Sequence, residues 1–136
     1  MRGDFFDTNI LVYTASADDL RFERAEALLS GGGAISVQML NEFTNVARRK
    51  MALDWPKIQR FLNGVCDLIS VIPLSVSTYR VALGLAQRYR FSVNDAVMVA
   101  SALKSDATTL FTEDLHDGLL IDGRLRVIDP FSDLTP

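Results

Sequence analysis

Short apolar runs alternate along the chain with longer segments in which apolar residues recur every three or four positions. Runs of the first kind predict β-strands, and segments of the second kind predict amphipathic helices. The expected strands lie at residues 4–7, 34–37, 71–72, 108–111 and 125–128. The expected helices span about residues 8–13, 20–29, 38–50, 54–69, 75–86 and 92–104. This alternation predicts an α/β fold with helices on both faces of a central, mainly parallel sheet of four to five short strands.

Several of these helices carry a start signal. Asp54 is a suitable N-cap with Pro56 in the first turn, and Ser75 and Ser92 are expected to open the next two helices. In the helix that follows Ser75, the apolar positions expected to face the core are Val76, Tyr79, Ala82, Leu83 and Ala86. The helix after Ser92 is apolar on almost every side, which predicts a buried, central position.

The length of 136 residues suits one domain over residues 1–136, with residues 130–136 as a C-terminal tail. No apolar run is long enough to cross a bilayer, and the first residues lack the pattern of a secretory signal. The single cysteine, Cys66, gives no disulfide framework, and its apolar helix predicts an inert, packed thiol. We therefore expect a cytoplasmic protein with no membrane contact.

The net charge of −3 argues at first against a nucleic-acid substrate, because proteins that bind phosphates are usually basic. That argument weakens if some of the acids exist to bind metal. Setting aside the four candidate acids described below changes the net charge from −3 to +1. Charge therefore does not exclude a nucleic-acid substrate.

Two acids directly follow predicted strands. Asp7 ends the first strand, and Asp114 comes shortly after the run TTLF. Ligands of open α/β sheets gather beyond the carboxyl ends of the strands, so both acids are candidate site residues. Each has a simpler alternative, since Asp7 can cap the following helix and Asp114 can be an ordinary loop residue. Glu113, next to Asp114, is expected to face solvent.

Two further acids lie on predicted helices. Glu42 sits beside the apolar stripe of the third helix, where it can lean into a cleft or remain a solvated boundary residue. Asp95 matches an S-x-x-[DE] capping box with Ser92. These roles can coexist with a ligand role, because a carboxylate in the first helical turn can still reach outward.

The order strand–Asp, helix–Glu, helix–Asp, strand–Asp is more informative than any single member. Clustered carboxylates resist ionisation unless a cation lies between them, and hard oxygen ligands favour Mg²⁺ or Mn²⁺. One histidine, His116, and one cysteine are too few for a zinc site. No G-x-S-x-G motif is present to support a serine nucleophile.

The segments FFDTNILVY, ISVQMLNEF, FSVNDAVMVASAL and LFTEDL, in this order and spacing, resemble the PIN domain. They are most similar to VapC-type toxins of bacterial VapBC toxin–antitoxin systems, and the resemblance extends from Asp4 to about Pro130. It implies a PIN-like three-layer α/β/α fold and a metal-dependent endoribonuclease that hydrolyses RNA phosphodiester bonds, the toxin component of a type II pair. The alternative is a non-catalytic RNA- or protein-binding module on the same fold. Such a module would be expected to have lost the acids, and all four are present.

Carried over residue by residue, the family's acidic cluster falls on Asp7, Glu42, Asp95 and Asp114. Its polar helpers fall on Thr8, Asn9, Ser36 and Thr112. We expect Asp7 and Asp95 to hold the principal Mg²⁺, with Mn²⁺ as a possible substitute, and Asp114 to contribute to the same ion or a second one. Glu42 would orient or deprotonate the attacking water, and cleavage would leave a 5′-phosphate and a 3′-hydroxyl. Asn94 departs from the bulkier residue that the family often has there.

The run Arg48-Arg49-Lys50 ends the predicted helix that carries Glu42. These residues can contact the RNA backbone, or they can stabilise the negative end of the helix dipole.

The resemblance also implies a cognate VapB-type antitoxin and a homodimer. A groove for the antitoxin is expected at Ile10, Val12 and Tyr13 with the helices that carry Phe22 and Phe61, unless these side chains form the core. The two helices between residues 54 and 90 are candidates for the dimer contact.

Overall fold

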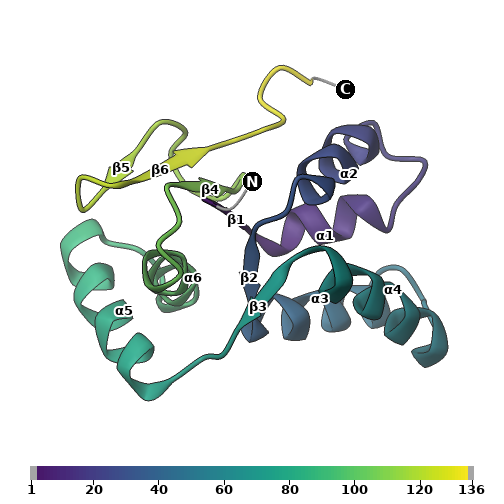
Figure 1. Ribbon diagram of the computed structural model, residues 1–136, viewed down its shortest axis with the longest axis horizontal. Helices are drawn as coiled ribbons and strands as arrows, with labels where there is room; N and C mark the ends of the chain where they lie inside the picture. The colour runs from purple at the N-terminus through teal and green to yellow at the C-terminus, as the bar shows by residue number, and fades with distance from the viewer. Residues whose placement is uncertain (1–2, 135–136) are drawn as a thin grey trace.

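The computed structural model describes residues 3–134, which form alternating strands and helices (Figure 1). The strands are β1 (Asp4–Phe6), β2 (Ala34–Ser36), β3 (Ser70–Ile72), β4 (Thr109–Phe111), β5 (Leu120–Ile121) and β6 (Leu125–Ile128). The helices are α1 (Thr8–Thr14), α2 (Phe22–Ser30), α3 (Val37–Arg49), α4 (Trp55–Leu68), α5 (Val76–Tyr89) and α6 (Val93–Lys104). The prediction of alternating short strands and helices is confirmed.

The sheet has the strand order β3-β2-β1-β4-β6-β5. From β1 the chain moves outward through β2 to β3, and it then returns to the other side of β1 as β4. Right-handed crossovers place the helices of the outward path on one face and those of the return path on the other. Accordingly, α1 to α4 lie on one side of the sheet, and α5 and α6 lie on the other (Figure 1).

Within residues 3–134 the sheet has six strands, so the prediction of four to five was too low. The missed strand, β5, is only two residues long and pairs antiparallel with β6, Leu120 opposite Arg126 and Ile121 opposite Leu125. Asp122, Gly123 and Arg124 connect the two strands, and the first two have positive φ angles of 50° and 70°. This Asp-Gly pair is a hairpin signal that the sequence contained.

The helix caps confirm the predicted helix starts at Asp54, Ser75 and Ser92. The Asp54 carboxylate accepts a hydrogen bond from the Lys57 N–H at 2.9 Å. The Ser75 hydroxyl accepts one from the Thr78 N–H at 3.2 Å. Helix α6 is buried over most of its length, as its uniformly apolar sequence predicted.

The predicted inward face of α5 is right for Ala82, which is buried, and for Ala86, which packs against the core, and wrong for the other three positions. Val76, Tyr79 and Leu83 are 70%, 45% and 40% exposed, and the buried positions are Thr78, Ala82 and Leu85. Both sets of residues recur at helical spacing, so the pattern alone could not choose between them. Helix α5 packs mainly against α6, and this tertiary contact selects which side of α5 is buried.

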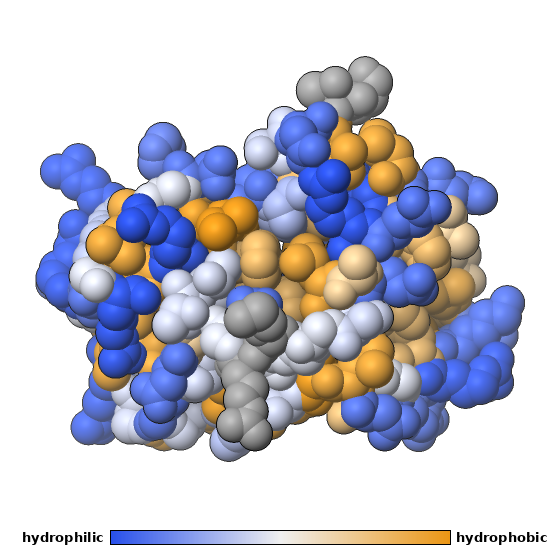
Figure 2. All heavy atoms as spheres, turned by 45° about the horizontal axis from the view of Figure 1, so that its top comes forward, coloured by the Kyte–Doolittle hydropathy of each residue, from blue (hydrophilic) through white to orange (hydrophobic). Residues whose placement is uncertain are grey.

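Apolar side chains also reach the surface elsewhere. Figure 2 shows a face on which they gather in patches between charged groups. The residues from 130 to 134, predicted as a tail, pack in part against the domain, because Phe131 is 3% exposed and meets the Tyr13 ring edge-on. Residues 135–136 lie outside the described residues, as do residues 1–2. Among the helices of residues 3–134, none has the length and apolar character needed to span a membrane.

Candidate active site

Asp7 lies at the carboxyl end of β1, where the strand order reverses between β1 and β4. It is only 5% exposed. One carboxylate oxygen, Oδ1, accepts a hydrogen bond from the Thr8 N–H at 2.6 Å, so Asp7 caps α1. The other oxygen, Oδ2, accepts one from the Thr112 hydroxyl at 2.6 Å. The capping role and a place in the site therefore coexist.

Asp114 lies in the loop after β4 and is exposed. Its backbone N–H donates to the Thr112 hydroxyl oxygen at 3.0 Å. Thr112 is fully buried and uses that same hydroxyl to donate to Asp7. A single threonine thus ties the segment that carries Asp114 to the side chain of Asp7. These two hydrogen bonds of the buried Thr112 hydroxyl fix the positions of Asp7 and Asp114 relative to each other.

The pKa values of Asp7 and Asp95 are raised by burial and by the nearby charge of Asp114. Burial, with a smaller contribution from the charge of Asp114, raises the pKa of Asp7 to about 7 against the opposing hydrogen bonds from Thr112 and Thr8. Burial also raises the pKa of Asp95, as does the charge of Asp114, while the Ser92 hydroxyl opposes the shift. Asp114 therefore acts electrostatically on both Asp7 and Asp95.

Glu42 is half-buried and projects from α3. Its Oε1 accepts a hydrogen bond from the Thr8 hydroxyl at 2.7 Å. Its Oε2 accepts one from the Asn94 amide Nδ2 at 2.9 Å. Sequence reasoning assigned no role to Asn94, because nothing in the local pattern of α6 shows that it faces α3.

Three of the four candidate acids, Asp7, Glu42 and Asp114, line a pocket of about 320 Å³. Its lining residues are Asp7, Thr8, Asn9, Glu42, Asn45, Val46 and Asp114. Asp95 does not line this pocket and lies half-buried in the first turn of α6. Its backbone N–H donates to the Ser92 hydroxyl at 3.1 Å, which is the Ser92 half of the predicted capping box. Across residues 3–134, no three acidic, histidine or cysteine side chains already form an arrangement that would hold one metal ion.

Of the other expected helpers, Asn9 lines the pocket and is half-buried. Ser36 is fully buried at the end of β2 and lies within 3.3 Å of the Met39 sulfur. It is not among the residues that line the pocket. Asn45 lines the pocket although the sequence did not single it out. It follows Glu42 by three positions, and helical spacing could have identified it.

The expectation that Glu113 faces solvent is wrong. Its side chain is 23% exposed and accepts a hydrogen bond from the Tyr13 hydroxyl. The Arg21 guanidinium lies 3.7 Å from the other carboxylate oxygen and packs over the Tyr13 ring. These contacts fasten the segment that carries Asp114 to α1. They join residues 100 positions apart, which no local pattern reveals.

In the basic run at the end of α3, Arg48 and Arg49 have different environments. Arg48 donates to the Leu53 carbonyl at 3.2 Å and lies over the Trp55 ring, 4.5 Å from its centroid. Arg49 is exposed and makes no hydrogen bond or ion pair with any residue from 3 to 134. It follows Glu42 by seven positions and Asn45 by four, so it shares the helix face that borders the acidic pocket.

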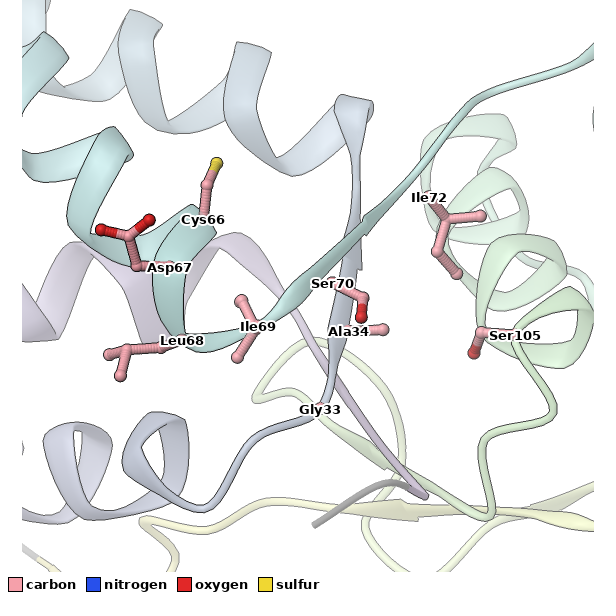
Figure 3. A pocket seen from close by; sticks show the side chains of 9 residues that line it. All are labelled: Gly33, Ala34, Cys66, Asp67, Leu68, Ile69, Ser70, Ile72 and Ser105. Atoms are coloured by element: carbon pink, nitrogen blue, oxygen red, sulfur yellow. The ribbon is translucent and has the colours of Figure 1, made fainter.

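A second hollow, of about 570 Å³, lies beside β3, a strand at the edge of the sheet (Figure 3). Its walls come from β2, the end of α4, β3 and Ser105 beyond α6. Asp67 is the only carboxylate among its lining residues, and the neighbouring Cys66 is exposed, which corrects the prediction of a packed thiol. With one carboxylate, this hollow offers less acid–base chemistry than the smaller acidic pocket.

An open, mainly parallel sheet with acids gathered at the carboxyl ends of β1 and β4 defines a class of α/β domains with an acidic pocket at the point where the strand order reverses. Within that class, the sequence of residues 5–116 matches the PIN domain. The chain belongs to the PIN domain family, which confirms the resemblance noted from its motifs. Comparison with the curated proteins finds no match.

Solved structures share this fold. A toxin–antitoxin complex from Klebsiella pneumoniae has a TM-score of 0.70 and 24% identity, covering 93% of this chain and 97% of that chain. VapBC2 from Rickettsia felis, bound to a promoter DNA fragment, has a TM-score of 0.66 and 21% identity over 93% and 98% of the two chains. VapC20 from Mycobacterium tuberculosis, a toxin that cleaves the sarcin–ricin loop, has a TM-score of 0.61 and 20% identity over 82% and 91%.

Proposed function

We propose that this protein is a metal-dependent endoribonuclease and the toxin component of a type II toxin–antitoxin pair in the cytoplasm. The observation that carries the proposal is the environment of Asp7. This carboxyl group is nearly buried beside Asp114, its pKa is raised to about 7, and it borders a pocket shared with Glu42. Strongly perturbed acids in a pocket are typical of catalytic and metal sites.

The donor chemistry fits a hard divalent cation, Mg²⁺ or Mn²⁺, because the acids and their neighbours offer only oxygen ligands. Asp7, Asp95 and Asp114 are the residues that would hold it, directly or through water. A positive charge there would favour the ionised forms of Asp7 and Asp95, which burial and mutual repulsion now disfavour. When bound, the ion would lower the pKa of a water molecule and neutralise charge on the scissile phosphate.

The protein's own groups would then orient the reactants. Thr8 and Thr112 fix the carboxylates of Glu42 and Asp7 by hydrogen bonds of 2.7 and 2.6 Å. Glu42 would accept a proton from the attacking water, and the Asn9 amide would donate to a phosphate oxygen. The products would carry a 5′-phosphate and a 3′-hydroxyl.

The proposed function is tested by incubating purified protein with total RNA in Mg²⁺ or in EDTA and mapping the new 5′ ends. We expect discrete cleavage sites with Mg²⁺, none with EDTA and none with the Asp95→Asn variant. Random degradation that persists in Asp95→Asn would indicate a contaminating nuclease. RNA binding without cleavage, together with no Mg²⁺ or Mn²⁺ binding, would favour the non-catalytic module.

Arg49 is the better candidate for an RNA phosphate contact, because Arg48 is already engaged with Leu53 and Trp55. Arg49→Glu should raise KM several-fold with little change in kcat. It should also reduce the dependence of log Kd on log salt by about 0.7, the value for one lost phosphate contact on a single strand. Arg48→Gln is the comparison: it should lower thermal stability and leave the salt dependence unchanged. Equal salt slopes for Arg49→Glu and the wild type would contradict this assignment.

The antitoxin would bind along α1, α2 and α4. Ile10, expected in such a groove, is fully buried and belongs to the core. A hollow of about 270 Å³ nevertheless remains there, lined partly by Leu29, Phe61, Val65 and Leu68. The toxin–antitoxin complexes among the similar structures support a partner of this kind.

For a homodimer, the exposed apolar side chains of α5 described above are the candidate contact.

Gly64 allows the groove to be filled without disturbing the core. It lines the hollow on α4, and an added Cβ there meets no atom within 4 Å. Gly64→Arg should weaken binding of the proposed VapB-type antitoxin by at least roughly tenfold, equivalent to ~1.4 kcal/mol. The matched control is Gly84→Arg on α5, where an added Cβ is equally unhindered. Identical antitoxin affinities for the two variants, measured by calorimetry, would remove this groove from consideration.

A further inference from the structure

We propose that Asn94 is a positioning residue for Glu42, an inference that rests on the proposed function. The Glu42 carboxylate is held on both sides, by the Thr8 hydroxyl on Oε1 at 2.7 Å and by the Asn94 amide on Oε2 at 2.9 Å. The two donors come from α1 and α6, and Glu42 itself comes from α3. Three helices on opposite faces of the sheet thus fix one side chain at the rim of the pocket.

The orientation of the Asn94 amide is itself fixed. Gln38, one turn before Glu42 on α3, donates from Nε2 to the Asn94 backbone carbonyl at 2.9 Å and to its Oδ1 at 3.3 Å. With Oδ1 facing this donor, the Nδ2 of Asn94 must face the Glu42 carboxylate. A flipped Asn94 amide would place its Oδ1 against the Glu42 carboxylate and its NH₂ group against the NH₂ group of Gln38.

Gln38 adopts this orientation at a cost. Its buried Oε1 has no hydrogen-bond partner among residues 3–134. Leaving a buried carbonyl unpaired is destabilising, so the local structure gains nothing from this atom. What the arrangement does achieve is to hold Asn94 toward Glu42. Departures from local stability of this kind concentrate at functional sites.

The chemistry of the contact suits a group that must act on water. Each oxygen of an ionised carboxylate has two lone pairs, so one hydrogen bond to each leaves Glu42 able to accept from a water molecule. Asn94 is neutral, and it therefore restricts rotation of the carboxylate without removing its negative charge. A lysine or arginine in its place would form an ion pair and lower the basicity of Glu42.

Asn94 also links Glu42 to the rest of the acidic group. It directly precedes Asp95, whose pKa responds to the charge of Asp114. The first turn of α6 thus carries both Asp95, one of the acids proposed to hold the metal, and Asn94, the hydrogen-bond partner of Glu42. A shift of this turn would displace both.

The kinetic test compares the wild type with Asn94→Ala under steady-state, multiple-turnover conditions on a defined RNA with Mg²⁺. We expect kcat to fall by about 10- to 100-fold, the range for loss of an orienting partner, with KM unchanged within about twofold. Asn94→Asp should lose at least as much, because it brings a second carboxylate against Glu42. The matched control is Asn41→Ala, an exposed asparagine on α3 next to Glu42, which should keep the wild-type kcat.

A double-variant cycle separates positioning from a general structural effect. If Asn94 acts through Glu42, Asn94→Ala should cause no further loss of kcat in a Glu42→Ala background. An unchanged kcat in Asn94→Ala, or an equal loss in both backgrounds, would overturn the proposal. Thermal melts of each variant show whether a loss of kcat reflects unfolding.

A measurement without RNA keeps this proposal distinct from the proposed function. In ¹⁵N-labelled protein, the Asn94 side-chain amide protons should be shifted by the Glu42 carboxylate, and Glu42→Ala should move them to the position of a solvated amide. An Asn94 signal that is the same in both proteins would show that the contact does not form in solution, which overturns the proposal. If the amide signal moves but the wild type cleaves no RNA, the contact is established and the nuclease assignment alone fails.

Discussion

Asp7→Asn should abolish RNA cleavage, lowering kcat by at least roughly a hundredfold, while the protein remains folded. The large loss is expected because the substitution removes a carboxylate from the proposed metal-binding group, and such electrostatic stabilisation contributes several kcal/mol to catalysis. Asparagine retains one oxygen that can accept from the Thr8 N–H or the Thr112 hydroxyl. At pH 8 without metal the melting temperature should be unchanged or higher than that of the wild type.

The rise in stability is expected because asparagine cannot ionise in this buried position. Asp67→Asn is a suitable control, since it removes an exposed carboxylate at the hollow beside β3. It should leave both kcat and the melting temperature close to the wild-type values. Full activity in purified Asp7→Asn would exclude Asp7 from the chemistry. An unfolded Asp7→Asn would show instead that folding needs both carboxylate oxygens as hydrogen-bond acceptors.

Without metal, the protein should become less stable as the pH rises. The pKa of Asp7 is raised from 3.8 to about 7, so the folded protein retains this proton at pH values where the unfolded chain has lost it. Stability from this group is complete below the unfolded pKa and is lost as the pH rises through the folded pKa. Between about pH 5 and pH 8 the free energy of unfolding should fall by about 3 kcal/mol. Asp95 shifts in the same direction and adds to the decline.

This decline is measured by urea denaturation at several pH values in buffer with EDTA. The depressed pKa values of Asp19 and Asp133 act in the opposite direction, but their effect lies below the usual aspartate pKa and outside the measured range. Asp7→Asn should flatten most of the profile. Mg²⁺ should flatten it for the wild type, because a cation favours ionised Asp7. A wild-type stability that is constant or rising from pH 5 to pH 8 in EDTA would contradict the assigned environment of Asp7.

Local chemistry in the sequence predicted most of the fold. The strand β1 before Asp7, the caps at Asp54, Ser75 and Ser92, and the apolar α6 are each specified by neighbouring residues. The alternation of strands and helices then predicts a parallel sheet, because parallel strands require long crossovers. β5 was missed because two residues are too few to show a period of two, although the Asp122-Gly123 turn signalled a hairpin.

The candidate acids were also identifiable from the sequence, since their types and their places after strands or on helices are local properties. The contacts that these acids make with other residues were not identifiable from the sequence. Thr112 meets Asp7 across 105 positions, and Asn94 meets Glu42 across 52. The inward face of α5 was decided by its packing against α6. The sequence by itself determined which segments become strands and helices and which acids could serve a site, because those depend on neighbours along the chain. Only the tertiary structure decided which hydroxyls and amides hold those acids and how far their pKa values move, because burial and long-range contacts arise when the sheet and its two helical layers assemble.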